Sequence, residues 1–204
     1  MRFVSHLDMN RFMTRVIRKT NIPVWYTQGF NSRLYIAFAL PLSLGFESDY
    51  EAMDLKITDD GYSPDDVVKE LKNVVPDSIV IVSAAEPIKK VSDIAFADFE
   101  ILFDGGDGYA EDISRFLQRE HIITQKKNKK GEMKQIDLAD SIIKKNVTVV
   151  DGNVQLCLTL PAGNNGNVNP QLILSAFESD TGIKLPFCSV TRTAIYDGNF
   201  ELFV

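Results

Sequence analysis

The chain has 204 residues, a net charge of −6, and a composition that is 45% hydrophobic and 25% charged. These values exclude disordered and fibrous proteins and allow one large domain or two small ones. The longest apolar run is far shorter than the roughly 18 residues of a membrane-spanning helix, and basic residues interrupt the region where a secretory signal would be apolar. We therefore expect a cytoplasmic protein that does not associate with a membrane.

The charge is unevenly distributed along the chain. Residues 1–35 contain six lysines and arginines and only one acidic residue, Asp8, so this segment carries +5 and the remainder carries −11. A basic surface on an acidic body suits one oriented polyanionic partner, or an acidic protein surface, better than indiscriminate binding.

The first half alternates strands and helices. Ser5 and Ser63 are predicted to cap helices, and Pro64 favours the first position of the second one. Four extended segments are predicted around these helices, besides the end of a strand at 1–4: 24–26, 34–40, 51–58 and a buried strand at 79–83. The order is that of a ferredoxin-like unit whose first strand is nearly missing. That strand either precedes the sequence at hand or is supplied from elsewhere.

The second half repeats this order without repeating the sequence. An alternating strand is predicted at 96–103, a helix from Tyr109, a hairpin around Asp151–Gly152, and a helix opened by Asn169 and Pro170. A lysine-rich hairpin at 124–137 is inserted among them. We predict an α+β protein of two ferredoxin-like units, 1–90 and 91–204, the first lacking most of its first strand.

His6 is a candidate catalytic residue in the first turn of the first helix. The helix dipole there favours neutral imidazole, which could act as a general base in metal-independent RNA cleavage. A lone histidine at this place is more simply explained by packing against the sheet. The sequence has no metal-ligand cluster, and Cys157 and Cys188 are expected to be strand-face thiols without a disulfide.

Arginines form a stripe along the first helix. Arg11, Arg15 and Arg18 share one face by their spacing, so they could contact successive phosphates or an acidic helix. The alternative is an ordinary solvated face, although such faces usually mix both charges.

Aromatic residues surround the turn that follows. Trp25, Tyr26, Phe30 and Tyr35 interleave with amides and Arg33, a combination that stacks bases in readers of single-stranded RNA. They could equally be core residues, and we expect at least half of the four to be buried. Gly29 indicates a turn with positive φ.

Two further segments could contact anions. Lys127 and Lys130 lie in the lysine-rich hairpin, which is either a solvated tip or a second phosphate-binding finger. The loop at 163–170 precedes a helix, but helix capping by Asn169 explains it without a ligand.

Three segments resemble a bacterial family of unknown function that is described as linked to radical-SAM proteins: residues 5–19, 21–48 and 192–196. Residues 135–138 and the Gly166, Val168 and Pro170 pattern also fit it. The chain has Ser32 where relatives have proline. The resemblance implies a radical-SAM protein as partner, and no cofactor of its own, because the sequence lacks a cluster-binding cysteine triad.

These observations predict a non-catalytic accessory domain of a radical-SAM system that binds RNA or presents a substrate. The predicted contacts are Arg11, Arg15, Arg18, Arg33, Trp25, Tyr26, Phe30, Lys127 and Lys130. An endoribonuclease using His6 and a pure protein-interaction module are the alternatives.

Overall fold

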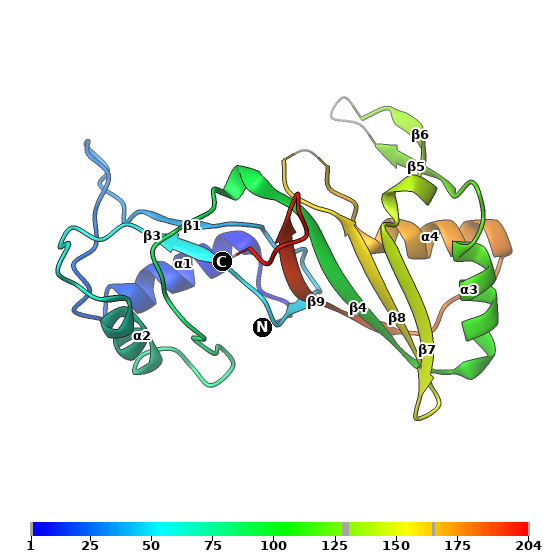
Figure 1. Ribbon diagram of the computed structural model, residues 1–204, viewed down its shortest axis with the longest axis horizontal. Helices are drawn as coiled ribbons and strands as arrows, with labels where there is room; N and C mark the ends of the chain where they lie inside the picture. Colours follow the sequence, from blue (N-terminus) through cyan, green and yellow to red (C-terminus); the bar gives the residue numbers. More distant parts are fainter. Residues whose placement is uncertain (1, 128–130, 165, 204) are drawn as a thin grey trace. The chain divides into compact units, whose positions relative to one another are not determined.

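We analysed a computed structural model, which describes residues 2–127, 131–164 and 166–203 (Figure 1). The predicted fold class is confirmed, since helices pack with antiparallel sheets. The chain divides into two compact units, one of residues 2–45 and 51–91, the other of residues 46–50 and 92–203. The short segment 46–50 therefore belongs with the later part of the chain.

The second unit is built on a five-stranded sheet with the order β2-β9-β4-β8-β7. Its elements are β2 (Glu47–Ser48), β4 (Ile94–Gly106), α3 (Ala110–Leu117), β7 (Lys144–Val150), β8 (Asn153–Pro161), α4 (Pro170–Thr181) and β9 (Cys188–Asp197). Leaving β2 aside, the order β9-β4-β8-β7 and the chain order βαββαβ are those of a ferredoxin-like unit. Strand β4, the first of this unit, lies between β8 and β9 and is antiparallel to both.

The core of the second unit lies between the sheet and its helices, which Figure 1 shows on one side of the sheet. Strands β4 and β8 alternate, so that Ile101, Phe103, Leu156 and Leu158 are buried. Phe116 of α3 and Phe177 of α4 meet edge to face, with ring centroids 5.4 Å apart.

Local sequence signals explain the turns and helix ends of this unit. Asp151 and Gly152 both have positive φ, as a two-residue hairpin between β7 and β8 requires. Asn169 caps α4 by accepting a hydrogen bond from the Gln171 N–H at 2.8 Å, and Gly182 ends the helix in the left-handed conformation.

A hairpin and three 3-10 turns, the first of which begins at the last described residue of the first unit, complete the second unit. The hairpin pairs β5 (Ile123–Lys127) with β6 (Met133–Asp137), and 3-10 turns lie at Val91–Asp93, Asp107–Tyr109 and Ala139–Ser141. Strand β2 pairs in parallel with β9, Glu47 opposite Thr191 and Ser48 opposite Arg192.

The first unit has a smaller sheet. Its elements are α1 (His6–Ile17), β1 (Ile36–Phe38), β3 (Met53–Leu55) and α2 (Pro64–Lys72). Strand β1 pairs antiparallel with β3, and Val24 continues the pairing opposite Ile57. The predicted caps are present, because the N–H groups of Asp8 and Asp66 donate to the hydroxyls of Ser5 and Ser63.

One apolar cluster holds this unit together. Its buried residues come from both helices and from the segments between them: Met13, Val16, Ile17, Ile22, Leu34, Val67 and Leu71. Alternate residues of the sheet, including Ile36, Phe38, Met53 and Leu55, pack against the same cluster. Both helices therefore cover one face of the sheet, and no helix in the described part of this unit covers the other face.

Two strand predictions in this unit are wrong. Residues 2–4, expected to end a strand, include a turn and no strand. Residues 79–83, expected to form a buried strand, have no strand pairing, and the side chains of Val80 and Val82 are 79% and 80% exposed. The apolar character of 79–83 indicated an extended segment correctly, but pairing depends on a neighbouring strand that the described residues do not provide.

Candidate functional site

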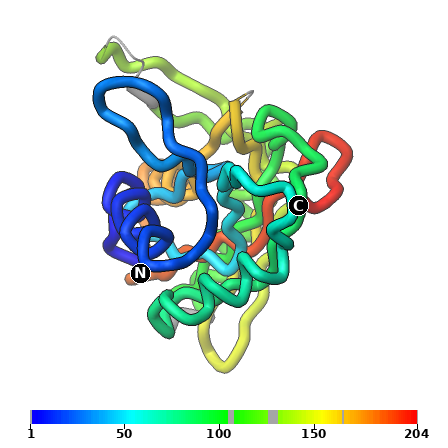
Figure 2. The backbone as a smooth tube through the Cα atoms, turned by 90° about the vertical axis from the view of Figure 1, so that its left-hand side faces the viewer, coloured from blue at the N-terminus to red at the C-terminus, as the bar shows by residue number. Residues whose placement is uncertain are grey.

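A hairpin formed by residues 25–35 projects from the sheet of the first unit and appears as the blue loop in Figure 2. Tyr26 pairs with Leu34. The Thr27 N–H donates to the Arg33 carbonyl at 2.7 Å, and the Arg33 N–H donates to the Thr27 hydroxyl at 2.9 Å. Gly29 has φ 125°, so the predicted positive-φ turn is confirmed. The hairpin is thus held at its base and leaves its tip open to solvent.

Trp25, Tyr35 and Lys56 form a contact group where this hairpin joins the sheet. The Trp25 and Tyr35 rings meet edge to face with centroids 6.0 Å apart. The Lys56 Nζ lies 4.4 Å from the centroid of the Trp25 ring, within the range of a cation–π interaction. The Tyr35 N–H donates to the Trp25 carbonyl and the Trp25 N–H donates to the Lys56 carbonyl, which places the three residues on adjacent chain segments.

These side chains lie on the helix-free face of the sheet. Successive side chains of a strand point to opposite faces, and the immediate neighbours Val24, Leu34 and Ile36 pack with the helices. By the same alternation, Arg33 and Tyr35 share the face of Trp25, and Lys56 lies between Leu55 and Ile57, which face the helices. We call Trp25, Arg33, Tyr35 and Lys56 the aromatic face.

The expectation that at least half of the four aromatic residues are buried is wrong. Trp25 is half-buried and Tyr35 is exposed. Phe30 is fully exposed at the tip of the hairpin, and Tyr26, opposite Leu34, keeps 37% of its surface exposed. The hairpin projects beyond the helices, so no second layer covers it. Alternation of residue types shows which side chains share a face of the sheet, but it does not show how far the helices extend over the sheet.

The arginine stripe lies on the other side of the first unit. Arg11, Arg15 and Arg18 are exposed, and Arg11 forms an ion pair of 3.3 Å with Asp8, an exposed pair that contributes little stability. The hydrogen bond from the Ser5 hydroxyl lowers the pKa of Asp8, and the neighbouring Arg11 and Arg15 lower it further. At 100° per residue the stripe points about opposite to Met13 and Val16, which face the sheet. The structure therefore does not bring the stripe together with the aromatic face.

His6 packs against the sheet, as the simpler interpretation of the sequence expected. Its ring meets Phe38 edge to face at 5.7 Å, and the Asn10 side-chain amide lies 3.0 Å from its Nε2. None of the ion pairs found in the described part of the chain involves His6. This geometry positions the ring against the sheet and adds no acid or base partner to it.

The lysine-rich hairpin can be only partly placed. Lys130 lies outside the described residues, and so does the side chain of Lys127. At the base of the hairpin, His121 Nδ1 lies 2.7 Å from the Asp137 carboxylate, which also accepts hydrogen bonds from the Ile122 and Ala139 N–H groups. The three interactions lower the pKa of Asp137 to about 2, the Ile122 bond most strongly. This pair was not among the predicted site residues, because no spacing rule indicates it.

A polar network on the second unit was also missed. The Asp98 carboxylate accepts hydrogen bonds from the Thr159 hydroxyl at 2.6 Å and from the Tyr196 hydroxyl at 2.8 Å. The Tyr196 bond raises the pKa of that tyrosine to about 12. Glu100, on the same face of β4, accepts a bond of 2.6 Å from the Gln155 amide. The sequence does contain a signal for a polar face here, because polar residues alternate with apolar ones in β4 and β8.

The thiol of Cys157 lies beside this network. Burial raises its pKa, and the carboxylates of Glu100 and Asp98 raise it further. A thiol that stays protonated is a weak nucleophile. Neither Cys157 nor Cys188 forms a disulfide, as the sequence analysis expected.

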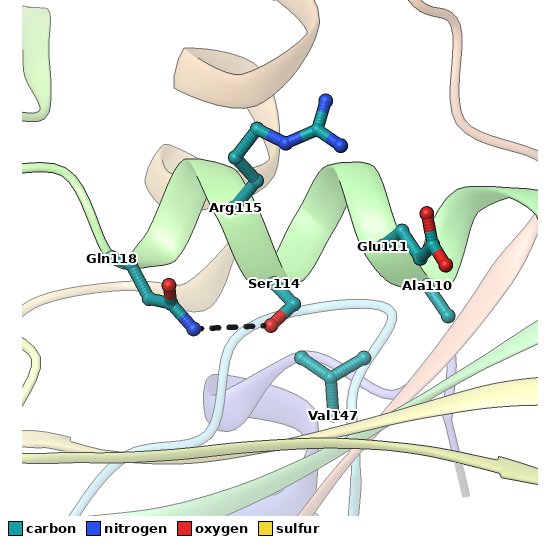
Figure 3. A pocket seen from close by; sticks show the side chains of 6 residues that line it. All are labelled: Ala110, Glu111, Ser114, Arg115, Gln118 and Val147. Carbon is teal, nitrogen blue, oxygen red and sulfur yellow. Dashed lines mark hydrogen bonds between the residues drawn. The ribbon is translucent and has the colours of Figure 1, made fainter.

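A shallow hollow of about 410 Å³ lies between α3 and β7 (Figure 3). Its lining is formed by Ala110, Glu111, Ser114, Arg115, Gln118 and Val147. Ser114 and Gln118 point toward Val147 and are joined by a hydrogen bond of 3.5 Å, whereas Arg115 points away. None of the residues predicted to bind a ligand lines this hollow, and it is wide open to solvent.

Two further features concern only the part of the chain that the structure describes. There, no group of three or more His, Cys, Asp and Glu side chains could hold a metal ion. No helix among these residues is both long enough and apolar enough to cross a membrane.

Residues 1–170 match the family model described as uncharacterized proteins conserved in bacteria (DUF2344). The chain belongs to this family. The match covers both the aromatic face and the arginine stripe, as well as the polar network as far as Thr159. No curated protein and no solved structure matches the sequence.

Proposed function

We propose that the first unit binds single-stranded RNA on its aromatic face and acts as a non-catalytic accessory of a radical-SAM system. The observation that carries the RNA proposal is the group of Trp25, Tyr35 and Lys56 on a sheet face without helices. The radical-SAM partner rests on the resemblance of residues 5–19 and 21–48.

The chemistry of this face fits unpaired bases. Aromatic rings on an open sheet stack bases, and each stacked base contributes about 1–3 kcal/mol. Lys56 and Arg33 supply positive charge beside the rings, while Asp54 on the same strand face is a single opposing charge. Phe30 at the hairpin tip offers a further ring. The face would bind a few nucleotides with little sequence preference.

Binding of RNA is tested by fluorescence anisotropy with an oligouridine of about ten nucleotides, a length suited to a small single-strand site. The Trp25→Leu and Tyr35→Leu double variant is expected to weaken binding at least tenfold. Phe187→Leu, which changes an exposed aromatic residue of the second unit, is the matched control and should leave affinity unchanged. Equal affinity of the double variant and wild type would rule out base stacking on this face.

The charge contribution has its own test. Lys56→Ala is expected to weaken binding severalfold and to reduce its dependence on salt between about 50 and 200 mM, because fewer counterions are released. Lys69→Ala, on the exposed side of α2, is the control of equal charge change. An unchanged salt dependence for Lys56→Ala would remove Lys56 from the proposed site.

The arginine stripe favours a second candidate function, docking of an acidic partner. Its three exposed guanidinium groups lie far from the aromatic face, so one short RNA would not reach both. The combined Arg11→Ala, Arg15→Ala and Arg18→Ala variant is expected to retain oligouridine binding and to lose co-purification with the radical-SAM protein. Loss of RNA binding with retained co-purification would instead assign the stripe to phosphates.

A further inference from the structure

Strand β7 forms one edge of the five-stranded sheet of the second unit (Figure 1). Among the described strands it pairs with β8 alone, over all its residues from Lys144 to Val150. An edge strand presents a row of backbone N–H and C=O groups to which another strand can pair, and charged residues commonly prevent this. The part of β7 from Val147 to Val150 carries no charge, and the side chains of Val149 and Val150 are 48% and 47% exposed.

The backbone groups of β7 point alternately toward β8 and away from the sheet. The two-residue turn after Val150 directs the backbone groups of that residue toward β8. By alternation, the groups of Lys145, Val147 and Val149 point away from the sheet. The described residues provide no hydrogen-bonding partner for these outward backbone groups. They are therefore available to a further strand.

The middle of β7 also has open space on its helix side. Val147 stands opposite the buried Leu156 of β8, so its side chain lies on the side of the sheet that the helices cover. There it lines the hollow of about 410 Å³, toward which Ser114 and Gln118 point from α3 (Figure 3). The helix thus does not close over the middle of β7, and a side chain of a second strand has room beside Val147.

We propose that two copies of this chain associate through β7, with the two strands antiparallel and Val147 opposite Val147 of the partner subunit. This register pairs the whole of β7 in both copies and joins outward backbone groups to outward backbone groups. The two valines meet beside the hollow. On the other side of the sheet, Asn146 lies opposite Thr148 of the partner subunit, where their side chains can form a hydrogen bond. The two sheets continue as one.

The charges of β7 favour a second copy as the partner. Lys144 and Lys145 stand at one end of the strand, and Asp151 follows the other end. In the antiparallel register the basic end of each copy meets Asp151 of the partner subunit. The two copies of Lys145 lie four residues apart along the seam, roughly 14 Å, so they repel each other little. The Lys145 ammonium also donates to the Leu117 carbonyl and keeps further donors for a carboxylate.

Sedimentation velocity of residues 1–204 at a series of micromolar concentrations measures the association. We expect the wild-type protein to form a dimer as its concentration rises. Val147→Pro removes the N–H group at the centre of the seam and should weaken dimerisation at least tenfold. The fold tolerates this change because that N–H group points away from β8. Val147→Thr keeps the N–H group and the branched shape, so this matched control should dimerise as the wild type does.

Two further comparisons do not depend on whether the fold tolerates proline. Asp151→Asn removes the charge but keeps a residue suited to positive φ, and should weaken dimerisation severalfold at low salt. Residues that exchange both hydrogen bonds across a seam have Cα atoms about 5.5 Å apart, within the range of a disulfide. Mild oxidation should therefore link two copies of Val147→Cys. It should not link Val149→Cys, whose two copies lie roughly 14 Å apart.

Three results would overturn the proposal. The first is a wild-type protein that stays monomeric, which would leave the β7 edge to a different polypeptide or to none. The second is a folded Val147→Pro variant, or an Asp151→Asn variant at low salt, that dimerises as strongly as the wild type. The third is equal cross-linking of the two cysteine variants, in which Cys157 and Cys188 are the same.

Discussion

Both units follow the same order of helices and strands, but only the second unit forms a sheet of several long strands. In the second unit every strand from β9 to β8 has neighbours on both sides, and β4 is buried at alternate positions. Among the described residues of the first unit, β3 has a neighbouring strand only on the β1 side. A sheet with two strands gains little stability by itself, and packing on helices must hold it. We therefore expect the second unit to contribute more to stability than the first.

The polar side chains carried by the two sheets also differ. The second unit carries hydrogen-bonded polar pairs on its strands, such as Asp98 with Thr159 and Tyr196. The first unit carries rings and basic groups, Trp25, Tyr35 and Lys56, that have room for a ligand. A face whose polar groups satisfy one another offers less to a partner than one whose rings remain accessible.

The largest expected effect tests the difference in stability. Ile101→Ala removes a fully buried side chain at the centre of β4 and is expected to cost about 2–5 kcal/mol of unfolding free energy. Leu55→Ala, at the half-buried centre of β3, should cost at or below the lower end of that range. Urea unfolding followed by circular dichroism measures both. A larger loss for Leu55→Ala would reverse the comparison.

The next effect concerns the polar network of the second unit. Tyr196→Phe removes a hydrogen bond to the Asp98 carboxylate and is expected to cost about 1–2 kcal/mol, the lower part of the range for bonds to charged groups because the site is partly exposed. The Tyr196 pKa of about 12 lies above the ordinary 10.0, so the bond stabilises the fold fully below pH 10 and is lost as pH rises through about 12.

Tyrosine titration by ultraviolet absorbance, compared with Tyr196→Phe, identifies this group. Asp98→Asn should lower the pKa of Tyr196 toward its ordinary value, because the carboxylate is the main cause of the shift. A titration curve that is identical in wild type and Tyr196→Phe near pH 12 would contradict the assignment.

Helix capping should contribute similarly in the two units. Ser5→Ala and Ser63→Ala in the first unit, and Asn169→Ala in the second, are each expected to cost about 1 kcal/mol. Ser114→Ala, inside α3, is the control and should cost less because alanine favours a helix interior. A much smaller cost for the two serines would show that the first unit depends on its helices less than its packing indicates.

The smallest effect is local and depends on pH. The pKa of Asp137, about 2, lies below the ordinary 3.8, so its contribution is fully present above pH 3.8 and is lost as pH falls toward 2. Hydrogen exchange of the Ile122 amide, which donates to Asp137, should quicken over this range relative to the intrinsic rate. Asp137→Asn should remove that pH dependence. An unchanged dependence in this variant would exclude Asp137 as its source.

Much of the local structure could be predicted from the sequence. Ser5, Ser63 and Asn169 mark helix starts because their side chains accept N–H groups that the first turn leaves without partners. Asp151–Gly152 marks a hairpin because both residues adopt positive φ at low cost. Exposure of Arg11, Arg15 and Arg18 also followed from helical periodicity.

The site could be predicted only in part. Trp25, Tyr35 and Arg33 were recognised from their composition, but Lys56 was not, because it reaches Trp25 from a strand thirty-one positions later in the sequence. The Asp98, Thr159 and Tyr196 network is assembled from three strands, so the alternation within each strand does not show which of these residues meet. Contacts of this kind depend on strand register, which the turns and the whole apolar core set together.

Helix ends, the β7–β8 turn and the chemical character of the aromatic hairpin were thus determined by the sequence itself, since short-range sterics and hydrogen bonds decide them. Only the tertiary structure decided that the arginine stripe and the aromatic face lie on opposite sides of the first unit, because that depends on which face each helix buries. It also decided that residues 79–83 pair with no strand among the described residues. An extended apolar segment becomes a strand only where a neighbour supplies the other half of its hydrogen bonds.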